Sequence, residues 1–347
     1  MRIDGIDLAR GLAVLGMVTA HVAPGGPDSP LPWSLTQVAD GRPSALFVVL
    51  SGVSVALMSG GVLPRTGVPL VQSRIRILAR AFVLLGVGGV LALMNTPVVV
   101  ILSTYAVLFA VAACVLRTSS TALLVSAAVV ALIAPPIRMW LQVSTMAGPG
   151  GAGVVDLVIG EHYPALVWIA YLLVGVAVTR ADLGARATRL WMLGGGVAAA
   201  VLGYGSAAVL TRVIDDPSFI VSQLITSEPH SSSSPEVLGN IGVALVTLAC
   251  CLWVAERWPR AVAPLTATGA LALTAYIGHI VAIRLLGSEV VWEPTATVWL
   301  AFLVVIIVGC WAWRTHIGRG PAEWALHRIA YRASDIKVTA TPTGDPT

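Results

Sequence analysis

Charged residues are scarce in this sequence. Only 11% of its 347 residues are Asp, Glu, Lys or Arg, and 57% are apolar. An ordinary soluble domain has roughly 25% charged residues, so the composition argues against that class. The net charge of +4 is scattered through short segments, which does not suggest nucleic acid. We therefore expect the lipid bilayer as a partner and no nucleic acid.

Cysteine is also rare, and known site motifs are missing. The four cysteines lie inside apolar runs, where they fit small packing residues rather than disulfides or zinc ligands. No two histidines have metal-ligand spacing, so we expect no metal. The sequence contains no Gly-x-Ser-x-Gly elbow, no P-loop and no dinucleotide-binding fingerprint, which argues against those nucleophile and nucleotide sites.

Long apolar runs dominate instead. Each has about twenty residues, enough to cross a hydrocarbon core of roughly 30 Å. Lipid cannot satisfy backbone polar groups, so these runs must be helices. We predict an all-α, polytopic transmembrane helix bundle of about ten (10–11) helices. The predicted spans are 6–24, 43–60, 79–95, 98–116, 121–138, 163–179, 190–212, 236–255, 263–283 and 294–313.

The basic residues predict an orientation. With ten spans and a cytoplasmic N-terminus, sixteen of the 21 basic residues lie in cytoplasmic segments and four at outer ends. This predicts a multi-pass protein of the cell (plasma) membrane with both termini in the cytoplasm. Asp7 and Arg10 interrupt the first apolar run, which favours a retained helix over a cleaved signal peptide.

We predict one transmembrane domain over residues 1–332. It ends in an interfacial helix at about 321–332, and a disordered cytoplasmic tail follows over 333–347. Residues 65–78 mix arginines with apolar residues and fit a second segment lying along the inner membrane surface.

Three polar residues share one face of the first predicted helix. Asp7 and Arg10 are one turn apart, and eleven residues separate Arg10 from His21, which is about three turns. A charge at mid-membrane costs at least roughly 3 kcal/mol, so such residues usually face a partner or a wet cavity. The row predicts an inner anion-binding group linked to an outer titratable group. Two simpler readings remain open: Asp7 and Arg10 neutralise each other, and His21 is a hydrogen-bonded packing residue.

A second group opens the second span at its outer end. Asp40 could orient His21 as a carboxylate orients an imidazole base, and Arg42 could hold an acidic or polar substrate group. In the alternative reading, Asp40 caps the helix and pairs with Arg42.

Later spans contain further candidates. Tyr276 and His279 lie one turn apart in the outer half of a late span, where His279 fits either a site or a packing role. Tyr105 is a polar position in the fourth span, where such residues often join helices by hydrogen bonds.

These patterns resemble a known group of membrane proteins. Asp7-x-x-Arg10-Gly11-Leu12-Ala13 followed by His21 is similar to the first helix of membrane acyltransferases, and Arg10 and His21 match the Arg-x10-His motif of acyltransferase type 3 proteins. The whole pattern resembles more closely the YeiB-like proteins and the catalytic domain of heparan-alpha-glucosaminide N-acetyltransferase. The further similar motifs are Asp40-Gly41-Arg42, Tyr163-Pro164-Ala165-Leu166-Val167-Trp168, Leu273-Thr274-Ala275-Tyr276 with His279, and Arg319-Gly320-Pro321-x-Glu323-Trp324.

The resemblance covers nearly the whole chain and implies acyl transfer. The donor is an acyl-CoA, usually acetyl-CoA, that enters from the cytoplasm, and the acceptor is an amine or hydroxyl, commonly on a sugar at the outer side. The chain lacks the large lumenal domain of the animal enzyme, which leaves the acceptor open, and we also consider a homodimer. The residues we assign are His21 and Asp40 to catalysis, Asp7, Arg10 and Tyr105 to the donor, and Arg42, Tyr276 and His279 to the acceptor.

Two other functions fit the same polar row. A transporter or exporter of a small polar or anionic metabolite would line a path with it, although we detect no internal repeat and few broken helices. The second alternative function is that of a membrane protein that binds acyl-CoA without turning it over. Within the acyltransferase hypothesis, His21 is either a general base or a transient acyl carrier.

Overall fold

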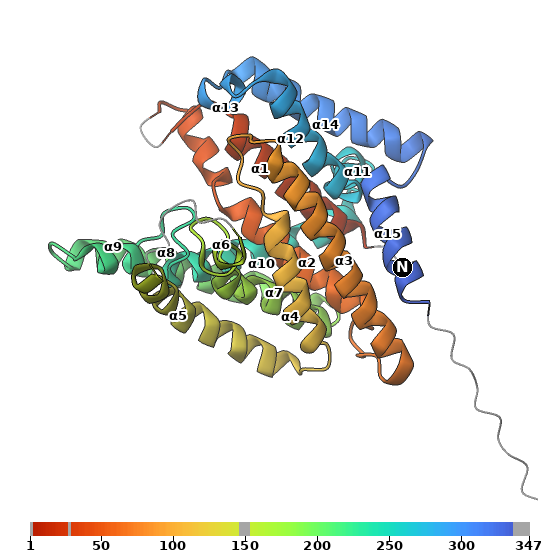
Figure 1. The fold of residues 1–347 in the computed structure, drawn as a ribbon, viewed down its shortest axis with the longest axis horizontal. Helices are drawn as coiled ribbons and strands as arrows, with labels where there is room; N and C mark the ends of the chain where they lie inside the picture. The colour runs from red at the N-terminus through yellow and green to blue at the C-terminus, as the bar shows by residue number, and fades with distance from the viewer. Residues whose placement is uncertain (1–2, 27–28, 146–152, 336–347) are drawn as a thin grey trace, which may run out of the picture.

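The computed structural model describes residues 3–26, 29–145 and 153–335, and all regular structure in these ranges is helical (Figure 1). The elements are α1 (Asp4–Val22), the 3-10 helix η1 (Trp33–Ala39), α2 (Arg42–Met58), α3 (Gly67–Leu93), α4 (Leu102–Cys114), α5 (Ser120–Thr145), α6 (Val154–Ile159), α7 (Ala165–Arg180), α8 (Arg186–Val213), α9 (Phe219–Ile225), α10 (Ser234–Arg257), α11 (Ala263–Ala270), α12 (Ala272–Leu286), α13 (Glu289–Trp292), α14 (Ala296–His316) and α15 (Pro321–Ala333).

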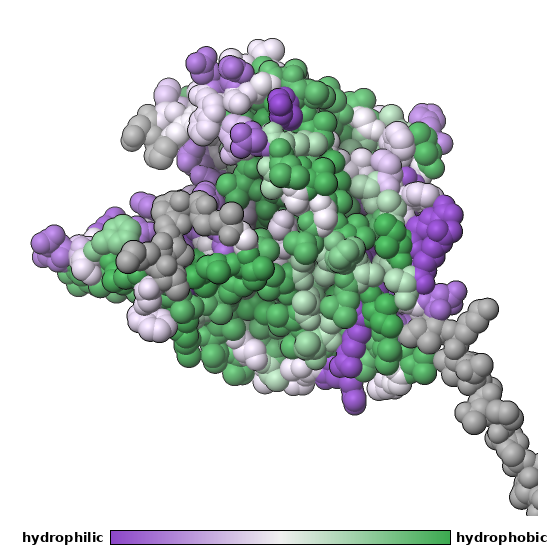
Figure 2. Space-filling view, viewed as in Figure 1, coloured by the Kyte–Doolittle hydropathy of each residue, from purple (hydrophilic) through white to green (hydrophobic). Residues whose placement is uncertain are grey.

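Seven helical segments within the described ranges are long and apolar enough to cross a membrane, and the bent pair α11 and α12 makes up to eight. Two shorter apolar helices, α4 and α7, lie where we predicted the spans 98–116 and 163–179. The all-helical membrane class is thus confirmed, while the count of about ten stays a prediction. Figure 2 shows hydrophobic residues over the middle of the visible face and hydrophilic residues mainly towards its upper-left and lower-right margins.

The helices form a bundle with a few deeply buried members at its centre. Almost every residue of α7 is buried, whereas α8 and α14 expose most of their apolar side chains. An apolar helix that is buried on all sides belongs to the core, and one with a long exposed apolar face contacts lipid. Figure 1 accordingly places α5 and α8 at one side of the bundle and α13 and α14 at the other.

Glycines allow the closest helix crossings. A β-carbon on Gly175 of α7 would lie 2.0 Å from the carbonyl oxygen of Val49 in α2. At the crossing of α1 and α11, a β-carbon on Gly269 would lie 1.6 Å from the carbonyl oxygen of Asp7. Small residues let membrane helices approach in this way, and here they bring the charged start of α1 against α11.

The span predicted over 263–283 is broken, which corrects the expectation of one continuous helix. The chain bends by 81° between α11 and α12. A break exposes backbone amides, which lipid cannot satisfy. The Glu323 carboxylate of α15 accepts hydrogen bonds from the amides of Leu273 at 2.7 Å and Thr274 at 2.9 Å, and from the Thr274 hydroxyl at 2.6 Å. Glu323, about fifty residues further along the chain, therefore satisfies the free amides at the start of α12.

The two predicted interfacial segments differ in outcome. Residues 65–78 do not form a separate element, because most of them belong to the continuous 27-residue helix α3. A helix does form at the C-terminal end, as α15, and its position in the interface stays a prediction. The predicted tail over 333–347 lies almost entirely outside the described residues.

We expect Gly269→Ala to destabilise the protein by roughly 1–3 kcal/mol, because the added methyl group forces α1 and α11 apart. Gly278→Ala is the matched control, since nothing lies within 4 Å of a β-carbon there. Thermal unfolding in detergent measures both. Equal unfolding temperatures for the two variants would contradict the close crossing.

Candidate active site

The charged start of α1 is held in a fixed arrangement. Asp7 is only 1% exposed, and its Oδ1 lies 2.7 Å from Nη1 of Arg10. Nη2 of Arg10 donates a second hydrogen bond to the Ser54 hydroxyl of α2 at 2.6 Å. Asp7 and Arg10 do pair, as the simpler reading expected. The second contact shows that Arg10 also reaches across to α2.

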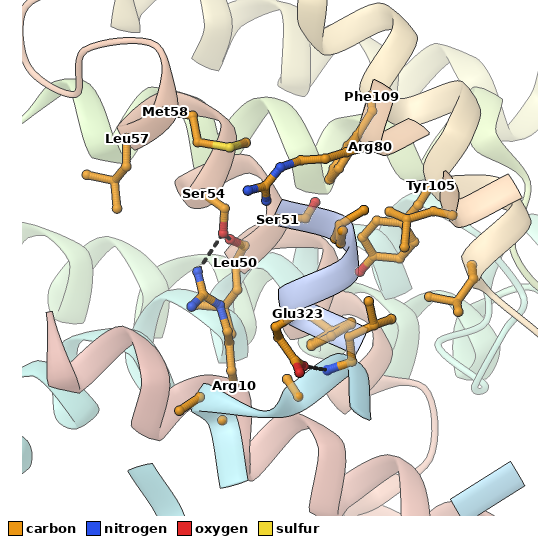
Figure 3. Close-up of a pocket in the computed structure, with 18 residues that line it drawn as sticks. Arg10, Leu50, Ser51, Ser54, Leu57, Met58, Arg80, Tyr105, Phe109 and Glu323 are labelled. Atoms are coloured by element: carbon orange, nitrogen blue, oxygen red, sulfur yellow. Dashed lines mark hydrogen bonds between the residues drawn. The ribbon is translucent and has the colours of Figure 1, made fainter. Parts of the chain in front are cut away.

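Arg10 projects into a cavity of about 360 Å³. Residues from α1, α2, α3, α4, α11, α12 and α15 line it. Figure 3 shows Arg10 and Arg80 pointing towards the same space, with Ser54 between them and Tyr105 to one side. The polar residues of the lining are Arg10, Ser51, Ser54, Arg80, Tyr105 and Glu323. The structure therefore brings two of the predicted donor-site residues, Arg10 and Tyr105, into one cavity.

Two polar atoms in this cavity have no partner. Within the described ranges, the Nε of Arg80 and the hydroxyl of Tyr105 are buried and form no hydrogen bond. Buried polar groups nearly always have a partner, because leaving one unsatisfied costs free energy. Both residues line the cavity, so a ligand with hydrogen-bonding groups could compensate them after a small rearrangement of their side chains.

Sequence reasoning missed Arg80 as a site residue. Arg80 comes just after the segment 65–78, which contains Arg74 and Arg76 and which we interpreted as interfacial. The available signal was its spacing of four residues from Arg76, which places both on one face of a helix.

Positive charge converges on the cavity. Arg10, Arg76 and Arg319 all lie close enough to Arg80 to repel its charge. His327 of α15 senses the same field: burial lowers its pKa, and nearby Arg319, Arg80 and Arg76 lower it further. Guanidinium groups bind phosphates and carboxylates through charge-assisted hydrogen bonds. The cavity is thus suited to an anion.

A pair of histidines joins α1 to α12. Nδ1 of His21 lies 3.2 Å from Nε2 of His279, and the two rings stack with centroids 5.4 Å apart. The Tyr276 ring packs edge-on against His279 at 5.1 Å, and its hydroxyl accepts a hydrogen bond from the Ile101 amide. One imidazole must donate to the other, so one ring presents a basic nitrogen.

Helices α1 and α12 contribute to both the cavity and the histidine pair, at different positions along each helix. His21 is not among the residues that line the cavity. Along α1, eleven residues or about 16 Å separate it from Arg10. Along α12, Ala272 and Leu273 line the cavity, and His279 follows within two turns. A long, flexible ligand is needed to connect the two.

Asp40 lies neither in the lining of the cavity nor in the histidine pair. Its Oδ1 is 3.6 Å from Nε2 of His230, and no recorded contact within the described residues joins it to His21. Asp40 also does not cap α2: the N-cap is Gly41, at a φ of 72° that favours glycine, and no side chain caps there. The sequence could not show that the loop with His230 returns to this place.

Arg42 joins a polar network beside this pair. Its Nε donates to the Tyr204 hydroxyl at 3.1 Å, and Tyr204 donates to Asn240 at 2.7 Å. Asn240 in turn donates to Glu236 at 3.2 Å. Arg42 is therefore occupied by protein groups, although its acceptor role stays a prediction.

Glu236 shapes the loop that presents His230. It accepts hydrogen bonds from the amides of His230 at 2.9 Å and Ser232 at 2.6 Å. Both residues have positive φ, at 63° and 53°, which costs free energy outside glycine. Sequence reasoning gave these residues no role.

Among the described residues, no cluster of three or more His, Cys, Asp or Glu side chains could hold a metal ion.

Comparison with known families identifies two matches. The family described as "Heparan-alpha-glucosaminide N-acetyltransferase, catalytic" matches residues 2–210, which include α1 and the two arginines of the cavity. The family described as "Protein of unknown function (DUF418)" matches residues 176–333, which include α12 and α15. The predicted resemblance to these two groups is confirmed. No curated protein matches the chain.

We expect the contact between Asp40 and His230 to stabilise the protein in a pH-dependent way. Burial lowers the pKa of His230, but the hydrogen bond to Asp40 and the carboxylates of Glu236 and Asp40 outweigh it, so the pKa is raised above 6.5. A raised histidine pKa contributes stability that is complete below about pH 6.5 and is lost as the pH rises through the folded value.

Asp40→Asn should therefore lower the free energy of unfolding by less than about 1 kcal/mol, because the pair is partly exposed. The unfolding temperature should fall most at about pH 5.5–6.5 and least at alkaline pH. The same substitution in a His230→Gln background is the control, and there the pH dependence should vanish. A constant loss at every pH would refute the ion pair.

Proposed function

The chain belongs to the heparan-alpha-glucosaminide N-acetyltransferase catalytic family, and we propose that it is a membrane acyltransferase. Its donor is an acyl-CoA, with acetyl-CoA as the first candidate, and its acceptor is an amine or hydroxyl that a sugar can supply. One observation carries the proposal: α1 and α12 both line the cavity that holds Arg10 and Arg80, and further along the same two helices they bring together His21 and His279.

The cavity supports the donor assignment. Coenzyme A has phosphates at one end and a thioester at the other end of a long, flexible arm. Arg10 and Arg80 suit the phosphates, and the unpartnered Tyr105 hydroxyl suits a polar group of the arm. Asp7 acts indirectly by holding Arg10 in place. The arm then extends along α1 and brings the thioester towards His21.

The histidine pair supports the chemistry. The acceptor attacks the thioester carbonyl carbon, and an imidazole nitrogen takes the proton that the acceptor loses. The carbon–sulfur bond breaks as the new carbon–nitrogen or carbon–oxygen bond forms, and the proton passes to the departing thiolate. If His21 attacks first, the acyl group rests on its nitrogen until the acceptor displaces it. Both routes use the same hydrogen bond between His21 and His279.

The membrane arrangement completes the proposal. With both termini in the cytoplasm and ten spans in the plasma membrane, the arginine cavity opens inwards and His21 lies near the outer side. Asp40, Arg42 and Tyr276 would then stand on the acceptor side. Acyl groups would thus pass from a cytoplasmic donor to an acceptor presented from outside.

Arg80→Gln should weaken acetyl-CoA binding to the purified protein by at least tenfold, since a hydrogen bond to a charged group is worth roughly 1.5–3 kcal/mol. Arg117→Gln is the control, because Arg117 is exposed and does not line the cavity. Calorimetric titration measures both. Unchanged affinity in Arg80→Gln would remove the donor assignment.

His21→Ala should keep acetyl-CoA binding and lose turnover by about 100-fold or more, the usual contribution of a general base. Release of free thiol from acetyl-CoA with an amine acceptor measures turnover. His316→Ala, which changes an exposed histidine of α14, should behave as the wild type. Equal turnover in His21→Ala would refute its catalytic assignment.

One observation favours a second candidate, a transporter of a small anionic metabolite. The broken span of α11 and α12 borders the cavity, and transporters commonly bind their substrates at such breaks. Flux of an organic anion into proteoliposomes without any coenzyme would support this function. Flux that is absent while thiol release proceeds would exclude it.

A further inference from the structure

A second hollow lies between α12 and α14, on the other side of α12 from the arginine cavity. Its volume is about 530 Å³. The lining runs from Leu271 to Leu286 on α12 and from Val298 to Trp313 on α14. This length corresponds to about 22 Å of helix, more than half of a roughly 30 Å hydrocarbon core. We call this hollow the lateral groove.

The lateral groove faces the hydrocarbon region. Its lining is almost entirely apolar, and α14 is one of the helices with the least buried surface. Val305, which lines it, is 68% exposed. In a membrane-spanning helix, such an exposed apolar side chain contacts lipid chains. The groove therefore opens sideways into the bilayer.

Two glycines keep the lateral groove open. Gly278 of α12 and Gly309 of α14 both line it, and a β-carbon at either would meet no atom within 4 Å. Large side chains at these positions would fill the space.

One buried polar group interrupts the apolar lining. His279 lines the groove and is 1% exposed. Its Nε2 is the atom that contacts His21. A ligand whose amine or hydroxyl lies at this point of the groove would therefore lie beside the histidine pair.

The two hollows lie against different faces of α12. Ala272 and Leu273 of α12 face the arginine cavity, whereas Thr274, Ala275 and His279 line the lateral groove. A donor held by the arginines occupies the first. The second is thus free for the other substrate.

We propose that the lateral groove binds the hydrocarbon chain of a membrane-borne acceptor, whose amine or hydroxyl lies at His279. This rests on the proposed acyl transfer and specifies its acceptor as a lipid or a lipid-linked molecule. The acceptor nitrogen or oxygen forms the new bond to the acyl carbon while the carbon–sulfur bond breaks. The acceptor's proton passes through the histidine pair to the departing thiolate, and the thiol of CoA leaves into the arginine cavity.

The first experiment measures occupancy without turnover. Hexadecylamine with a diazirine in its chain is added to the full-length protein in lipid nanodiscs and photolysed, and the labelled peptides are identified by mass spectrometry. We expect labelling concentrated in α12 and α14. Gly278→Phe and Gly309→Phe should reduce it at least tenfold, because the ring fills the lateral groove.

Gly195→Phe is the matched control. Gly195 lies on exposed α8, and its β-carbon would also meet nothing within 4 Å. This variant should label as the wild type does. Equal labelling of all lipid-facing helices, or labelling that the two groove variants leave unchanged, would overturn the proposal.

The second experiment separates the groove from the transferase function. Acetyl transfer from acetyl-CoA is measured with hexadecylamine and with water-soluble glucosamine. We expect faster transfer to hexadecylamine, reduced at least tenfold in Gly278→Phe with acetyl-CoA binding unchanged. If transfer to glucosamine is faster than transfer to hexadecylamine and is unchanged in Gly278→Phe, the proposal of a lipid acceptor is wrong. Groove labelling without transfer to either amine would instead refute the transferase itself.

Discussion

A backbone cannot end a helix inside a bilayer unless something satisfies its free amides, and this requirement governs the whole site. The break between α11 and α12 is possible because the Glu323 carboxylate accepts the hydrogen bonds that the start of α12 offers. The 81° bend then opens the arginine cavity on one side and aims His279 at His21. Without that carboxylate, the amides of Leu273 and Thr274 would lose their side-chain partner at the bend.

The charges of α1 follow a related logic. Asp7 is almost fully buried and is compensated by Arg10, which leaves the other arm of the guanidinium group for Ser54 and the cavity. Arg80 has no such internal partner at its Nε, although burial makes an unpaired cation expensive. The protein thus pairs the charge of Arg10, whereas the Nε of Arg80 in the same cavity has no hydrogen bond.

The sequence predicted what depends on local pattern. Hydrophobic length identified the all-helical membrane class, and the position of Arg10 and His21 on the first helix followed from the apolar run around them, because both depend on the geometry of a single helix. It did not predict contacts made by distant segments. The break at Leu271 requires Glu323, and the partner of Asp40 is His230, on a loop whose return no periodicity records. Arg80 was missed because its basic neighbours resembled a membrane-surface segment.

The dependence of α12 on α15 also has a consequence for how the protein is made. Fifty residues separate Leu273 from the carboxylate that receives its amide. A ribosome completes α11 and α12 well before it reaches Glu323, so the kink in the nascent chain lacks its carboxylate until α15 emerges. A chain truncated before Pro321 would therefore enter the membrane with the amides of Leu273 and Thr274 lacking this partner.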